Sequence, residues 1–160
     1  MKLVFILLLI ISSVETIAQS NDTGTVIFCK KSFSVPSSCA TASKDQIFCA
    51  DYSMFWIYPG DLMLAGNAKS LAAQMSKEIG NCKPDSIKAF LLDEEINAIK
   101  LSCKIDDVPN YIFIAYGIVN KAGVIAIINI KKDPKRNEDI PQPIRQIFKL
   151  SYTGDKQPKI

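Results

Sequence analysis

The side chains that can support acid–base chemistry in this chain are carboxylates, because the sequence contains no histidine. Without histidine there is no Ser-His-Asp or Cys-His activation of a nucleophile and no imidazole proton shuttle. Two acidic runs stand out, Asp93-Glu94-Glu95 and Asp106-Asp107. Glu94 or Glu95 together with Asp107 would supply the acid and the base of a glycoside hydrolase. Acidic runs between strands are more typical of solvated turns, and we favour that interpretation.

Thiols are the second set of reactive groups, at Cys29, Cys39, Cys49, Cys82 and Cys103. In an exported protein such residues form disulfides by default, and five cysteines leave one thiol over. We expect Cys82 to pair with Cys103, because the strands near them are predicted neighbours, and one further bridge within the first three cysteines. The even spacing of those three would suit a metal, but zinc sites use short Cys-x-x-Cys pairs that are missing here. We therefore expect neither a metal nor a cofactor.

The first 18 residues have the pattern of a secretory signal peptide. An unbroken apolar stretch from Leu3 to Ile11 is followed by a polar segment and by Thr16-Ile17-Ala18, which suits cleavage. A membrane span needs roughly 20 apolar residues, and Glu15 ends this one earlier. We expect a secreted or periplasmic domain over residues 19–160, with no stable membrane insertion after cleavage.

The chain has 160 residues, a length that fits one domain. Its composition indicates which classes of partner are expected. The net charge is +3, and lysines and arginines are spread along the chain instead of forming one basic stripe. A nucleic-acid partner is therefore not expected.

The stretch from Tyr111 to Lys131 predicts the centre of the fold. It contains two apolar runs rich in β-branched and aromatic residues, separated by Asn120-Lys121-Ala122-Gly123. Such runs are typical of strands, and Asn and Gly tolerate the positive φ of a hairpin turn. Both faces of these strands are apolar, so both faces must be covered, which places the hairpin in the middle of a sheet.

The most aromatic segment, Tyr52 to Tyr58, is followed by Pro59-Gly60, which is typical of a type II turn. We expect a hairpin that pairs residues 55–58 with residues 62–65. Large aromatic side chains mostly lie in the core, and we favour that interpretation for Trp56. The alternative is that Tyr52, Trp56 and Tyr58 form a partly exposed face that anchors a protein partner.

Helical periodicity predicts one main helix over about 68–79, capped by Asn67 and ended by Gly80. A short C-terminal helix over about 141–150 would place Ile144, Ile147 and Phe148 on one stripe, followed by a loose tail. The remaining expected elements are strands at 25–28, 46–50, 87–92 and 99–105, and a loop at 30–44.

These elements predict a single α+β domain, with an antiparallel sheet of five to seven strands. One helix followed by a four-strand meander resembles the cystatin-like arrangement, and the Tyr58-Pro59 turn ahead of the helix is similar to the PsbP/Mog1-like one. Both similarities concern the order of elements and imply no site residue.

Two functions, beside a purely structural role in the cell envelope, are consistent with this sequence. The first is an exported, non-enzymatic protein-binding domain of the inhibitor or immunity type, whose partner is another exported protein. The second is a small-molecule or glycan-binding protein, or a hydrolase that uses the paired carboxylates.

Overall fold

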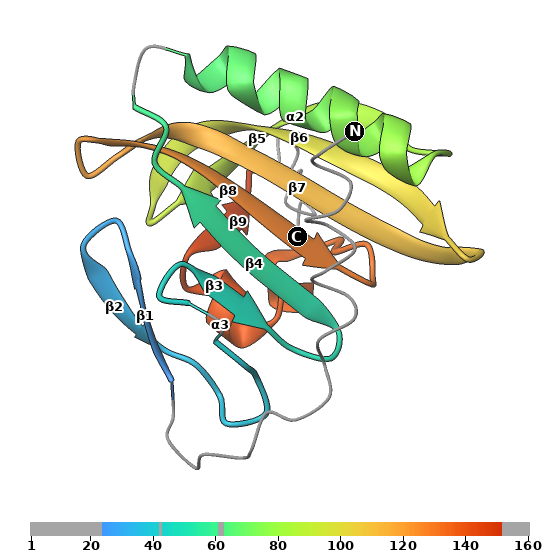
Figure 1. Cartoon of the computed structure of the whole chain (residues 1–160). Helices are drawn as coiled ribbons and strands as arrows, with labels where there is room; N and C mark the ends of the chain where they lie inside the picture. Colours follow the sequence, from blue (N-terminus) through green and yellow to red (C-terminus); the bar gives the residue numbers. More distant parts are fainter. Residues whose placement is uncertain (1–23, 42, 61–62, 152–160) are drawn as a thin grey trace, which may run out of the picture.

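A computed structural model describes residues 24–41, 43–60 and 63–151. The predicted signal peptide and the predicted loose tail lie outside these residues. Within the described part, a seven-stranded antiparallel sheet has the order β3-β4-β8-β7-β6-β5-β9, and β1 and β2 form a separate hairpin (Figure 1). The strands are β1 (Thr25–Phe28), β2 (Lys31–Ser34), β3 (Gln46–Phe48), β4 (Tyr52–Ile57), β5 (Lys83–Leu91), β6 (Glu94–Ile105), β7 (Val108–Val119), β8 (Ala122–Ile130) and β9 (Phe148–Leu150). The helices of the described ranges are α2 (Leu64–Ile79), the 3-10 turn η1 (Asn137–Asp139) and the short α3 (Gln142–Arg145). The predicted α+β fold, with one main helix and a short second one, is confirmed.

The hairpin of β7 and β8 lies in the middle of the sheet, as its two apolar faces predict. Val119 pairs with Ala122 across a two-residue turn. Both turn residues, Asn120 (φ 48°) and Lys121 (φ 64°), adopt positive φ. This geometry matches the twist of the flanking strands, so the strands run regularly up to the turn.

The two faces of the sheet are covered by different parts of the chain, which gives three layers (Figure 1). On one face α2 packs through Leu64, Ala68 and Ala72 against β6, β7 and β8. The small alanines allow the helix to approach the sheet closely. On the other face the β1–β2 hairpin and the segment of α3 and β9 bury a larger core, which includes Phe28, Met54, Phe113, Ile128, Ile144 and Phe148.

The helix begins earlier than predicted. α2 starts at Leu64, so Asn67 lies inside its first turn instead of capping it. The predicted hairpin between residues 55–58 and 62–65 is therefore wrong, since Leu64 and Ala65 are helical. β4 instead pairs along its whole length with β8, from Tyr52–Ile130 to Ile57–Ile125. Pairing with a central strand buries more of β4 than a local hairpin could.

Three other segments differ from expectation. The predicted loop at 30–44 contains strand β2, and the predicted helix at 141–150 ends at Arg145 and is followed by strand β9. Glu94 and Glu95 belong to β6, because the turn before it contains only Leu92 and Asp93, both at positive φ. Very short strands carry little periodicity of their own, so their existence depends on a partner strand.

The predicted disulfide Cys82–Cys103 is confirmed, and the second bridge joins Cys39 to Cys49. The first bridge attaches the segment after α2 to β6. The second attaches the loop before β3 to the turn between β3 and β4. Cys29 is the left-over cysteine, and its thiol is buried. None of the helices in the described ranges is long and apolar enough to cross a membrane.

An ion pair attaches the loop after β8 to the sheet. The Lys100 ammonium donates to Asp133, and it also lies over the Tyr111 ring, 5.3 Å from its centroid. The two charged side chains are only about a fifth exposed. Burial raises the pKa of Asp133, but hydrogen bonds from Lys100 and Lys135 outweigh this effect, so the pKa lies below its ordinary value.

We predict that Asp133→Asn lowers the free energy of unfolding by about 1–2 kcal/mol at neutral pH. A carboxyl whose pKa is lowered in the folded state stabilises the fold above its unfolded pKa, and this contribution disappears as the pH falls through the folded pKa. The difference between wild type and variant should therefore shrink in acid. Urea unfolding at neutral and acidic pH measures it. Asp51→Asn is the control, because the Asp51 side chain is 80% exposed and its removal should change little.

A second prediction concerns Gly117, which lies in β7 directly against Ile96. A Cβ at position 117 would meet the Ile96 Cγ2 at 2.5 Å. Gly117→Ala should lower the free energy of unfolding by about 1–3 kcal/mol through overpacking. Gly66→Ala, in α2, is the matched control: its nearest neighbour would be 3.9 Å away, and it should stabilise the fold by up to about 1 kcal/mol. Equal effects of the two substitutions in thermal unfolding would contradict this account.

Candidate functional site

The acidic runs lie at opposite ends of β6. Because a strand rises about 3.3 Å per residue, Glu94 and Asp107 are separated by on the order of 35 Å. Paired glycosidase carboxylates are about 5–10 Å apart. Glu94 accepts a hydrogen bond from the backbone N–H of Asn120, and Glu95 pairs with Lys88 in solvent. The structure therefore does not bring these carboxylates together.

The cysteines do not form a metal site either. No group of three or more Cys, Asp or Glu side chains in the described part of the chain is arranged to hold a metal ion. Burial raises the pKa of the Cys29 thiol, outweighing the hydrogen bond from Tyr58. A buried thiol of raised pKa is a poor nucleophile.

Of the three predicted partner-binding aromatics, Tyr52 and Trp56 share one face of β4 and Tyr58 directly follows the strand. The β1–β2 hairpin packs against that face. Trp56 is only 2% exposed, and its ring meets Phe28 edge to face at 5.3 Å. Tyr52 is half-buried, with its hydroxyl 3.4 Å from the Cys39 sulfur. Tyr58 remains 45% exposed, although its hydroxyl accepts a hydrogen bond from the backbone N–H of Cys29. Trp56 thus lies in the core, whereas Tyr58 keeps an exposed surface at this strand end.

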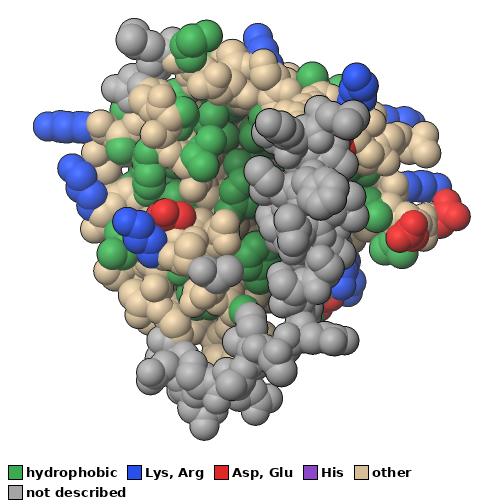
Figure 2. Space-filling model, viewed as in Figure 1, with side chains coloured by type: hydrophobic (Ala, Val, Ile, Leu, Met, Phe, Trp, Pro, Cys, Tyr) green, Lys and Arg blue, Asp and Glu red, His purple; other side chains and the backbone are tan. Residues whose placement is uncertain are grey.

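An exposed apolar surface lies beside the start of α2, formed by Ile57, Met63, Tyr116 and Ile118; we call it the apolar end patch. The exposed fractions of Ile57, Met63 and Ile118 are 47%, 66% and 53%. Ile57 and Tyr116 both pair with Ile125, one from each side of β8. Ile118 lies two residues beyond Tyr116, toward the end of the sheet. Figure 2 shows hydrophobic side chains gathered beneath α2, with lysines and arginines at the margins.

A shallow hollow of about 320 Å³ adjoins this patch. Met63, Tyr116 and Asn97 are among its lining residues, and none of the described lining residues carries a charge at neutral pH. Large apolar side chains exposed together in this way mark interaction surfaces, whereas single exposed ones are common on any protein.

Sequence reasoning did not identify this patch. Ile57 and Ile118 were expected to pack in the sheet, and Met63 was expected within the second hairpin strand at 62–65. Their exposure depends on where α2 begins, since Leu64 is the first residue that the helix buries on the sheet. The only signal in the sequence was the apolar character of Leu62, Met63 and Leu64 ahead of the assumed cap at Asn67.

Comparisons of the chain with protein-family models, curated proteins and solved structures gave no match.

Proposed function

We propose that the mature chain is an exported, non-enzymatic binding domain of the inhibitor or immunity type, and that it engages another exported protein through the apolar end patch. The observation that carries this proposal is the clustering of Ile57, Met63 and Ile118 around Tyr116, each about half exposed or more. Burying such side chains against a partner removes apolar area from water, at roughly 25 cal/mol per Å².

Export is supported by two independent features. The first 18 residues have the composition of a signal peptide. Two disulfides form between cysteines of the described chain, and disulfides persist in oxidising compartments.

The absence of histidine from the sequence and the separation of the acidic runs along β6 support a role in binding more than one in catalysis. The second candidate function, a hydrolase with paired carboxylates, would require Glu94 or Glu95 to approach Asp107. The hollow beside the patch also offers few polar side chains, which favours an apolar protein surface over a glycan at this position.

The test is affinity capture with three immobilised proteins: wild type, the triple variant Ile57→Thr/Met63→Gln/Ile118→Thr, and Ile27→Thr. All begin near Ser20 and are exposed to envelope and secreted extract of the source cells. Each exposed side chain should contribute about 1–2 kcal/mol to binding, so the triple variant should lose its partner at least tenfold. Substitutions of exposed side chains should leave the fold intact.

Ile27→Thr is the matched control, because Ile27 on β1 is 48% exposed but lies outside the patch. A protein retained at near-equal stoichiometry by wild type and by this control, and lost by the triple variant, supports the proposal. A partner retained equally by all three proteins would rule out the patch. Retention of no protein by folded, oxidised wild type would favour the small-molecule alternative.

A further inference from the structure

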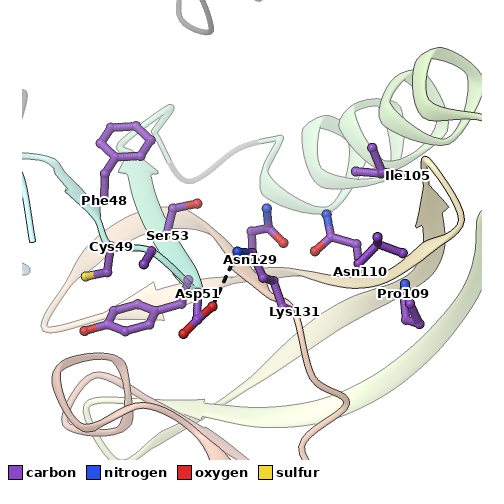
Figure 3. A pocket seen from close by; sticks show the side chains of 12 residues that line it. Phe48, Cys49, Asp51, Ser53, Ile105, Pro109, Asn110, Asn129 and Lys131 are labelled. Carbon is purple, nitrogen blue, oxygen red and sulfur yellow. Dashed lines mark hydrogen bonds and ion pairs between the residues drawn. The ribbon is translucent and has the colours of Figure 1, made fainter. Parts of the chain in front are cut away.

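A cleft of about 340 Å³ opens at the other end of β7, between the β3–β4 turn and the β6–β7 turn. Ser53, Asn129 and Asn110 lie in it side by side, on neighbouring strands β4, β8 and β7 (Figure 3). Ile105 and Val108 flank one side of this polar row, and Phe48 flanks the other. The strand rise separates Asn110 from Ile118 by roughly 25 Å, so the cleft is distinct from the apolar end patch.

Strand register explains why the two asparagines share a face. Ser53 and Ile112 both pair with Asn129, one from each side of β8. Asn110 lies two residues before Ile112, so its side chain is on the same face and diagonal to Asn129. This is the face that α2 covers further along the sheet. The helix packs mainly against β6 and β7, which leaves the corner at β4 and β8 open.

The amide oxygens of Asn110 and Asn129 are buried, and neither accepts a hydrogen bond from any described residue. Asn110 as a whole is only 8% exposed. Buried acceptors are almost always paired in native proteins, so two unpaired ones in a single cleft call for an explanation. Whichever amide atom, oxygen or nitrogen, occupies each of these two buried positions, it has no hydrogen-bond partner among the described residues.

The surroundings of these oxygens indicate which donor would satisfy them. The charged groups that line the cleft, Asp51 and Lys131, pair with each other at 3.4 Å and are largely exposed. The polar row itself is uncharged, so a cationic donor finds no compensating carboxylate beside the asparagines. Hydroxyl groups suit the row because each can both donate and accept. Ile105 and Val108, 41% and 55% exposed, offer apolar contact to a carbon skeleton next to those hydroxyls.

We propose that this cleft binds a neutral, polyhydroxylated ligand of the size of one or two sugar rings, with its hydroxyls donating to Asn110 and Asn129 and its C–H face on Ile105 and Val108. The volume lies within the usual range for small-molecule sites. The proposal concerns a second site and does not depend on protein binding at the apolar end patch.

The experiment is a titration of the mature, ¹⁵N-labelled protein followed by NMR, with the side-chain amide signals of the asparagines as reporters. The probes are glucose, galactose and N-acetylglucosamine, together with cationic glucosamine and anionic glucuronate. We expect saturable shifts of the Asn110 and Asn129 signals with at least one neutral sugar, at millimolar affinity, and at least tenfold weaker binding of its charged counterparts.

Variants separate a binding role from a purely structural one. Asn110→Leu and Asn129→Leu should each weaken binding of the neutral sugar at least tenfold, measured from the backbone signals of Val108 and Ile105. The melting temperature should hold or rise, because an unpaired polar group is removed. Asn97→Ala, outside the cleft, and the triple variant of the apolar end patch should both leave the affinity unchanged.

Three outcomes would overturn the proposal. One is the absence of saturable shifts in the asparagine signals with every neutral sugar. Another is binding that survives in the double variant Asn110→Leu/Asn129→Leu. The third is a preference for the charged sugars. A loss of stability in the leucine variants without any sugar binding to the wild type would assign the two amides a structural role only.

Discussion

The structure depends on one constraint, which is that the central β7–β8 hairpin is apolar on both of its faces. Phe113 and Ile114 are adjacent in β7, point to opposite faces, and are both fully buried. A sheet with this composition is stable only when each face is covered. One cover is a single amphipathic helix. The other is assembled from two pieces distant in sequence, the β1–β2 hairpin and the segment of α3 and β9, whose buried residues belong to one core cluster on the face opposite α2.

The parts of the fold that local sequence determines could be predicted. The run from Tyr111 to Lys131 is long, β-branched and interrupted by a residue pair that accepts positive φ, so its hairpin follows from local physics. The end of α2 at Gly80 (φ 71°) and the Cys82–Cys103 bridge follow in the same way. The start of α2 does not, because burial of Leu64 on the sheet outweighs the local capping preference of Asn67.

The surface features were harder to predict, because exposure is a property of the assembled layers. Ile57 and Ile118 have the same sequence character as buried isoleucines and differ only in lying beyond the start of the helix. The sequence allowed two positions for Trp56, in the core or on a binding face. The β1–β2 hairpin decides between them because it packs against that face of β4, and only β1 was predicted. Asn129 interrupts an isoleucine-rich strand and was a usable signal. Asn110 follows Pro109 and was assigned to a turn.

The sheet order also determines which strands can pair first while the chain is being synthesised. Strands β5 to β8 form a meander of sequence neighbours, each able to pair as soon as the next one emerges. β4 has no such neighbour, since its long partner is β8, some seventy residues later in the chain. Its contact with the three-residue β3 is too short to be stable alone. The N-terminal third of the protein, with its aromatic core residues, therefore has no long partner strand until β8 has been synthesised, when most of the chain is complete.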